Sequence, residues 1–439
     1  MTSELRMTIA AAPIAPIGAN QALIFLLQLG LLLGVALLLG RLALRLRMPA
    51  VVGELTAGVL LGPSLLAHAA PGVSAWLLPA DPAQLHLLDA IGQLGVLLLV
   101  GFTGMHIDLD LVRRKGATAL WVSAGGLLVP LVLGIWLGFL LPSSLVAEGS
   151  QREVLALFLG VAMCVSAIPV IAKTLYEMRL LHRNIGQLII SAAAVDDIVG
   201  WLMLSVISAL AAGGLHAGRV AISIGNLAAV IAFAVLVARP VVRRVLAMAS
   251  RSPDPGVTVA AIVVMLLFSA AGTQALGMEP ILGTFLCGIL IGSSGRLDRA
   301  ALVPLRTFVM AVLAPIFFAT AGLRMDLTAL GRPAVLASAV VVLAIAIGGK
   351  FAGAYLGARM GRLGHWDGLA LGAGLNARGI IEVIVAMVGL RLGVLSTATY
   401  TIIVLVAVVT SLMAAPTLRY AVRRIAVTSE EIEREKVFT

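Results

Sequence analysis

Long apolar stretches recur along the whole chain and are separated by short segments that carry most of the charged residues. A helix needs about 20 mostly apolar residues to cross a bilayer. Stretches of that length recur from Ala22 to the C-terminal region. The pattern predicts an all-α polytopic membrane protein with about thirteen transmembrane helices. Their centres lie near Leu32, Leu60, Leu97, Leu128, Met163, Ile198, Ala232, Leu266, Cys287, Leu313, Ile345, Ile380 and Leu412.

The composition also indicates a membrane protein, because 61% of the residues are hydrophobic and 12% are charged. A soluble domain usually has about a quarter of charged residues, so a soluble fold with a single anchor is excluded. The two cysteines, Cys164 and Cys287, lie inside apolar stretches, where we expect buried free thiols. No spacing of histidine or cysteine marks a metal site, and we expect no cofactor. The first twenty residues lack a signal-peptide pattern.

The distribution of positive charge predicts the orientation in the membrane. If each loop is assigned to a side, most of the 31 Lys and Arg residues fall on one side. By the positive-inside rule that side is the cytoplasm. Residues 1–20 and the N-terminus are then extracytoplasmic, and the C-terminus is cytoplasmic. The net charge of +10 therefore reflects topology in a cell inner (plasma) membrane rather than nucleic-acid binding. The opposite side receives only Arg6, Arg152, Arg219, Arg324, Arg332 and Arg391.

Two short blocks occur twice in the same order. VGELTAGVLLGPS (residues 52–64) aligns with LGTFLCGILIGSS (residues 282–294), and GMHIDL (residues 104–109) aligns with GLRMDL (residues 322–327). Either this is chance similarity between Gly- and Leu-rich helices, or the chain contains two five-helix repeats. An odd number of spans separates the units, so the repeats would have inverted orientations. Inverted repeats are typical of secondary transporters, with the substrate site near the midplane.

One helix of each predicted repeat contains residues that interrupt a helix. Pro169 lies in the middle of the fifth span, three residues after Ser166. Proline removes a backbone hydrogen bond and clashes with the preceding turn, so a break or a plain kink is expected there. In the twelfth span, glycines surround Asn376 and Arg378. Broken ends would expose helix dipoles, which Asp197 and Arg378 have the right charges to neutralise.

Three charged residues lie deep within predicted spans. Asp196 and Asp197 are adjacent in the middle of the sixth span, and Lys350 lies in the eleventh. A charge at the bilayer centre costs roughly 2.5–3.5 kcal/mol on insertion scales. The acidic pair therefore predicts a proton or cation site, with Lys350 as its charge partner or, alternatively, as a snorkelling residue. Glu54 and Glu382 are expected to stabilise a helix N-terminus or a buried Arg rather than to bind the ion.

Several blocks of the chain resemble the monovalent cation:proton antiporter-2 family, a group of sodium/proton and potassium/proton antiporters with crossed broken helices. The resemblance covers roughly residues 42–420. Its blocks are LRMPAVVGELTAGVLLGPS, VDDIVGW, APIFFATAGLRMDL, the GK of span eleven, and LNARGIIEVIVAMVGLRLGVLS. It implies a transporter rather than an enzyme, and a homodimer. It also implies that residues 21–425 form the antiporter domain, followed by a short cytoplasmic tail at 426–439. Panel helices would occupy 21–112 and 257–328, core helices 117–213 and 334–424, and a linker helix 219–247.

The resemblance also implies roles for the site residues. Asp197 looks like the carboxylate that binds cation and proton in turn, Asp196 like the partner of Lys350, and Ser166 like an additional ligand. The Asp-Asp pair resembles electrogenic sodium/proton exchangers, whereas related proteins often carry Asn-Asp. We therefore expect an Na⁺/H⁺ antiporter, with K⁺ as a possible substrate. The alternatives are an electroneutral K⁺/H⁺ antiporter, a channel-like K⁺ efflux protein and a sodium/organic anion symporter.

Overall fold

The structure, a computed structural model, describes residues 18–46, 48–79, 81–105, 107, 109–180, 182–213, 217–252, 254–295, 302–429 and 431. Throughout these residues the chain is helical apart from short connections, and its β pairing is limited to one antiparallel bridge between Val146 and Leu395. Most of the predicted extracytoplasmic segment 1–20 and most of the predicted tail 426–439 lie outside the described residues. The predicted all-α fold is confirmed.

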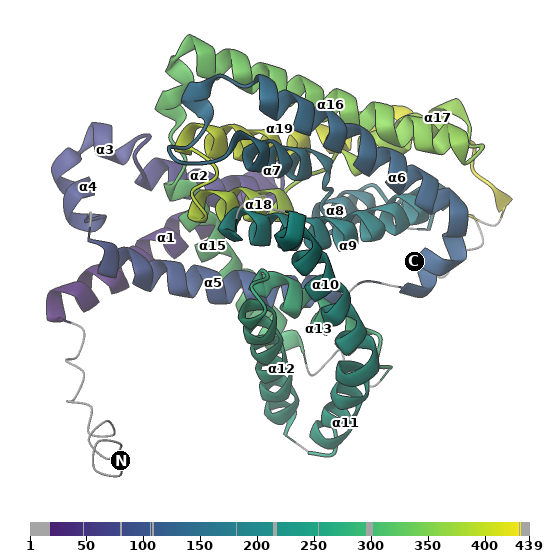
Figure 1. Cartoon of the computed structure of the whole chain (residues 1–439), viewed down its shortest axis with the longest axis horizontal. Coiled ribbons are helices and arrows are strands. Elements are labelled where there is room, and N and C mark those ends of the chain that lie inside the picture. The colour runs from purple at the N-terminus through teal and green to yellow at the C-terminus, as the bar shows by residue number, and fades with distance from the viewer. Residues whose placement is uncertain are drawn as a thin grey trace.

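The first half of the chain forms the following elements, which Figure 1 shows in purple, blue and teal. They are α1 (Ala19–Arg45), α2 (Ala50–Leu61), α3 (Leu66–Ala69), α4 (Pro71–Leu77), α5 (Pro82–Met105), α6 (Leu109–Leu140), the short helix η2 (Ser143–Leu145), α7 (Arg152–Cys164), α8 (Ile168–Glu177), α9 (Asn184–Gly213) and α10 (Ala217–Phe233).

The second half forms the remaining elements, which include two π-helical turns. They are η3 (Ala234–Ala238), α11 (Arg239–Ala249), α12 (Pro255–Ala275), α13 (Pro280–Gly292), α14 (Val303–Phe308), η4 (Val309–Leu313), α15 (Ala314–Leu323), η5 (Leu327–Gly331), α16 (Pro333–Met360), α17 (His365–Leu375), α18 (Ile380–Arg391) and α19 (Thr397–Val422).

The predicted count of thirteen spans is not confirmed by length and hydropathy alone. Within the described residues, ten helices are long and apolar enough to cross a membrane, and the bent pair α17–α18 makes eleven. The two remaining predicted spans correspond to α13, which has 13 residues, and to α7 with α8, which a break divides into 13 and 10 residues. These pieces are individually too short to pass as spans. The chain is a multi-pass membrane protein.

Close helix packing at equivalent glycines supports the inverted repeats. A Cβ atom on Gly58 of α2 would lie 1.9 Å from the carbonyl oxygen of Ala319 on α15. A Cβ atom on Gly288, its counterpart in α13, would lie 2.2 Å from the carbonyl oxygen of Gly101 on α5. Only glycine permits such close backbone contact. The glycine-rich helix of each repeat thus packs against a helix of the other repeat, so the two units interlock.

The same comparison extends each repeat by one helix at its start. A Cβ atom on Gly53 of α2 would lie 2.1 Å from the carbonyl oxygen of Leu39 on α1. For Gly283 of α13, the equivalent distance to the carbonyl oxygen of Ser269 on α12 is also 2.1 Å. Helices α1 and α12 therefore occupy matching positions, although the repeated sequence blocks begin only in the next helix.

A second packed group surrounds the broken helices and contains α6, α7, α9, α16, α17 and α19. Helices α6 and α16 lie side by side along their length (Figure 1). A Cβ atom on Gly125 of α6 would lie 2.3 Å from the carbonyl oxygen of Gly353 on α16. The first packed group, which contains the glycine contacts described above, joins α1, α2 and α15 to α5, α12 and α13. That these groups move as separate core and panel stays a prediction.

Candidate ion-binding site

Two interrupted helices cross inside the protein. The helix α7 ends at Cys164 and α8 begins at Ile168, while α17 and α18 are bent by 48° at their break. The backbone N–H of Ala167 donates to the carbonyl of Ala377 over 3.1 Å, so the two breaks contact each other directly. The predicted interruption of both spans is confirmed. Pro169 is the second residue of α8, a helix position where its missing N–H is tolerated.

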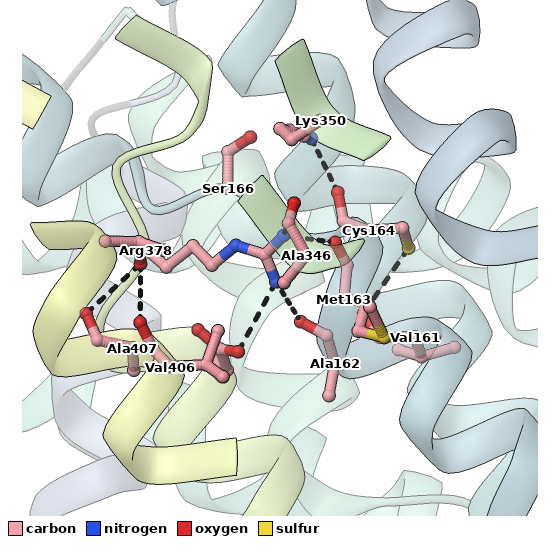
Figure 2. A network of polar contacts seen from close by, with 12 residues as sticks. Val161, Ala162, Met163, Cys164, Ser166, Ala346, Lys350, Arg378, Val406 and Ala407 are labelled. Atoms are coloured by element: carbon pink, nitrogen blue, oxygen red, sulfur yellow. Dashed lines mark hydrogen bonds and ion pairs between the residues drawn. The ribbon is translucent and has the colours of Figure 1, made fainter. Parts of the chain in front are cut away.

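Two buried cations neutralise the C-terminal end of α7. The guanidinium of Arg378 donates to the carbonyls of Ala162 over 2.9 Å and Met163 over 2.5 Å. The ammonium of Lys350 donates to the carbonyl of Cys164 over 2.6 Å. Figure 2 shows both side chains directed at this helix end. The last carbonyls of a helix have no partners within it and carry partial negative charge, so both cations stabilise the broken end.

Arg378 also holds the second interrupted helix. Its guanidinium donates to the carbonyl of Ala346 on α16 over 2.9 Å and lies 3.4 Å from the carboxylate of Glu382, in the first turn of α18. The hydroxyl of Ser411 on α19 donates to the carbonyl of Arg378. Arg378 and Glu382 therefore form a buried structural pair, as expected for Glu382 from its position.

Asp196 is surrounded by hydrogen-bond donors. Its Oδ1 accepts from the hydroxyl of Ser123 on α6 over 2.6 Å. Its Oδ2 accepts from the hydroxyl of Ser166 and from the ammonium of Lys350, each over 2.7 Å. Ser166 also reaches the carbonyl of Leu375 at the end of α17, over 2.9 Å. The predicted pairing of Asp196 with Lys350 is present, and Ser166 links this pair to both breaks.

Asp197 has the opposite environment. Its side chain is fully buried and no side chain among the described residues donates to its carboxylate, which faces only the backbone N–H of Ile168, the first residue of α8. The side chain of Asn376, at the end of α17, is likewise buried with both polar atoms unpaired. An ionised carboxylate in such a setting is very costly unless it is paired. Asp197 is therefore stable here when it is protonated or when it holds a cation.

Helix geometry explains why two adjacent residues differ so much. Successive side chains of an α-helix point about 100° apart. Asp196 points to α6 and α16, which supply Ser123 and Lys350. Asp197 shares a helix face with Trp201, one turn later, and the Trp201 ring packs against Phe285 of α13 with their centroids 5.8 Å apart. Asp197 thus lies on the side of α9 that faces the other packed group.

The predicted residues fall into three sets. Ser166, Asp196 and Lys350 are bonded together, and Arg378 and Glu382 form a second pair. Among the described residues, Asp197 and Asn376 form no side-chain hydrogen bond with either set. The sequence prediction missed Ser123. Its only signal is a hydroxyl in the middle of the fourth span, which many transmembrane helices contain.

Interlocked inverted repeats, two interrupted helices crossing at a buried charge cluster and an unpaired intramembrane acid together define an ion-coupled secondary transporter. A sequence model described as "Sodium/hydrogen exchanger, transmembrane" matches residues 32–424. The chain belongs to this family. The resemblance to monovalent cation:proton antiporters found in the sequence is thereby confirmed.

Relatives over the whole length point the same way. The Na⁺/H⁺ antiporter NhaS4 of Synechocystis sp. is 32% identical over 401 residues, which cover 90% of this chain and 97% of that protein. The Na⁺/H⁺-K⁺ antiporter GerN of Bacillus cereus is 27% identical, covering 90% and 96%. The solved structure of the sodium proton antiporter MjNhaP1 from Methanocaldococcus jannaschii at pH 8 covers 92% of this chain and 99% of its own, with a TM-score of 0.71 and 15% identity. That likeness shows the shared fold.

Proposed function

We propose that this protein is a secondary active antiporter that exchanges a monovalent cation, Na⁺ in preference to K⁺, for H⁺ by alternating access. The observation that carries the proposal is the contrast at the crossing: Asp196 accepts from three side chains, whereas Asp197 is buried without a side-chain partner among the described residues. A site of this kind binds one positive species at a time. The proposed activity is transport rather than catalysis.

The coupling follows from the cost of burying a charge. Na⁺ and K⁺ are hard cations that prefer oxygen ligands, and the carboxylate of Asp197 supplies both oxygen and charge. The same oxygens bind a proton, so cation and proton compete. A carboxylate that holds neither would be an unpaired buried charge, which is strongly disfavoured in the membrane. The empty carrier therefore reorients poorly, and each crossing transports either H⁺ or the cation.

The number of protons per cation depends on Lys350. If the Lys350–Asp196 pair opens when the cation binds, Asp196 also holds the cation and both Asp197 and Lys350 release a proton. Two H⁺ per cation then move net charge, and this electrogenic mode is the one we favour. If Lys350 keeps its proton, exchange is electroneutral, with one H⁺ per cation. In the electrogenic mode, the 2.7 Å ion pair between Lys350 and Asp196 and the hydrogen bond from Lys350 to the Cys164 carbonyl must both rearrange.

The names of the relatives include both Na⁺ and K⁺, because NhaS4 is named an Na⁺/H⁺ antiporter and GerN an Na⁺/H⁺-K⁺ antiporter. Electroneutral K⁺/H⁺ antiport and channel-like K⁺ efflux are therefore the alternatives. A homodimer in an inner (plasma) membrane, with the N-terminus outside and the C-terminus in the cytoplasm, completes the proposal. Its basis is the charge distribution and the family.

The test is ΔpH-driven exchange in proteoliposomes with Na⁺, Li⁺, K⁺ and Rb⁺ supplied in turn. We expect H⁺ movement that depends on the cation, with Na⁺ and Li⁺ more effective than K⁺. Uphill cation movement driven by ΔpH excludes a channel. A reversal potential under opposing gradients then separates the electrogenic from the electroneutral mode. Cation flux that ignores ΔpH would contradict the proposal.

A further inference from the structure

A row of buried polar side chains continues along α9 beyond Asp197. Trp201, Ser205 and Ser208 are 1%, 0% and 4% exposed. The indole Nε1 of Trp201 and the hydroxyl of Ser205 have no hydrogen-bond partner among the described residues, and the Ser208 hydroxyl interacts with the carboxylate of Glu279. Serines in this helix can bond to their own backbone, since Ser191 donates to the carbonyl of Gln187 over 2.8 Å. Ser205 and Ser208 do not.

The spacing places this row on one face of the helix. Steps of four, four and three residues from Asp197 keep the side chains within about 80° of one another. The row is roughly 16 Å long at 1.5 Å per residue. It faces the neighbouring group of helices, because the Trp201 ring packs on Phe285 of α13. Buried polar groups with few or no partners are unfavourable, so a row of them on one helix face requires an explanation other than stability.

The row leads to the N-terminal end of α13, where three charged or polar side chains meet. Glu279 precedes α13, and its carboxylate interacts with the hydroxyl of Ser208 at the end of the row. Arg391, the last residue of α18, lies 3.8 Å from this carboxylate and donates to the Oε1 of Gln93 on α5 over 2.5 Å. We call Gln93, Glu279 and Arg391 the outer cluster. The cluster ties an interrupted helix to both α5 and α13.

The outer cluster lies on the side that the positive-inside rule assigns as extracytoplasmic. Arg391 is among the six basic residues assigned to that side. On the other side of the crossing, a small apolar pocket lies between α2 and α8, α18 and α19, with Gly379 and Ser411 among its lining residues. The outer cluster thus ties the two groups of helices together at the outer end.

We propose that the face of α9 formed by Trp201, Ser205 and Ser208 is the extracytoplasmic access route to Asp197, and that the outer cluster is its gate. The inference rests on the proposed function, since it supplies the path for the same cation and proton. In this structure the route is closed. The Arg391 contacts hold α18 against α5 and α13, and the Trp201 ring fills the path next to Asp197. When the gate opens, water entering the route hydrates its polar side chains and brings the ion to the carboxylate of Asp197.

Cysteine accessibility tests the route without relying on transport. The Ser208→Cys variant is treated with a membrane-impermeant thiol reagent from the extracytoplasmic side. The labelling rate is compared with and without the gate substitution Arg391→Gln. We expect labelling of S208C to become about tenfold faster in the gate variant, as loss of a charge-assisted hydrogen bond and an ion pair gives. The unsubstituted chain, in which Cys164 and Cys287 are both buried, provides the background.

Two further variants keep the test decisive. Gln93→Ala removes one gate contact and leaves Arg391 in place, so it serves if R391Q folds poorly, and we expect a smaller acceleration of the same kind. Ser191→Cys lies on the cytoplasmic side of Asp197, and its external labelling should not respond to either gate substitution. Equal labelling rates of S208C with and without the gate substitution would overturn the proposed route. Labelling of S208C only from the cytoplasmic side would overturn it as well. Correct labelling in a protein that exchanges no cation would overturn the proposed function instead.

Discussion

Asp196 and Asp197 are consecutive in one helix and equally buried, yet their surroundings differ completely. Asp196 accepts from the side chains of Ser123, Ser166 and Lys350, whereas Asp197 accepts from no side chain among the described residues. A rotation of about 100° between neighbouring side chains separates them. The difference shows how one acid can balance charge within the protein while the next one is left to bind a transported ion.

The largest effect on exchange is expected from removing the charge of Asp197. Asp197→Asn keeps an oxygen but can neither carry the proton nor neutralise a cation. We expect exchange in proteoliposomes to fall by at least about a hundredfold, a loss of roughly 2.7 kcal/mol or more in transport free energy. The variant should stay folded, because it removes a buried ionisable group that has no side-chain partner among the described residues. Substantial exchange in a well-folded D197N protein would refute the assignment.

The next test concerns the paired acid and its lysine. Asp196→Asn or Lys350→Met alone leaves one buried charge without its partner, which typically destabilises a protein by about 3–5 kcal/mol. The double variant removes both charges and should recover much of that stability. Thermal unfolding in detergent measures the coupling between the two sites. If the single losses simply add in the double variant, the ion pair does not act as a unit.

A smaller effect is expected at Ser123, which supplies one of the donors to Asp196. Ser123→Ala should cost about 1.5 kcal/mol, since a hydrogen bond to a charged group is lost. Exchange should decrease several-fold, because Asp196 and Lys350 are held less firmly. The matched control is Ser191→Ala, whose hydroxyl bonds only to its own helix. Equal effects of the two substitutions would show that the Ser123 bond has no special role.

The smallest effect on exchange is expected at the N-terminal end of α9. Glu431 accepts from the backbone N–H of Asn184, the first residue of α9, over 2.6 Å and pairs with Arg183 over 3.1 Å. Partial burial by itself raises the pKa of Glu431. Hydrogen bonds from the Thr428 and Asn184 backbones, together with the Arg183 charge, outweigh it, so the pKa lies below its ordinary value.

Glu431→Gln should therefore lower stability by about 1 kcal/mol and leave exchange unchanged. Because the folded pKa is the lower one, this stabilisation is fully present above the ordinary Glu pKa of about 4.3 and is lost as the pH falls further. Unfolding measured at pH 7 and near pH 3 tests this, since the wild-type and variant proteins should converge at the acidic end. A clear change in transport would mean that this helix end takes part in exchange.

The parts of the site that sequence could predict are those that physics makes conspicuous in a membrane. Asp196, Asp197 and Lys350 stand out because charges are rare at such depth, and the interruption near Pro169 because proline disrupts a helix. The role of Ser123 and the row of Trp201, Ser205 and Ser208 depend on the rotation of each helix against its neighbours. Single polar residues of these types are common in spans, so only the packing distinguishes them. The span count was also uncertain because α13 and the halves of the broken helices are short.

The proposed mechanism requires that one carboxylate, Asp197, holds either a proton or a cation. Proton release on addition of Na⁺ measures this exchange in purified protein, in weakly buffered detergent solution with a pH indicator. We expect the wild-type protein to release protons in a saturable manner and D197N to release none under the same conditions. Proton release from D197N equal to that of the wild-type protein would contradict the mechanism, because another group would then exchange the proton.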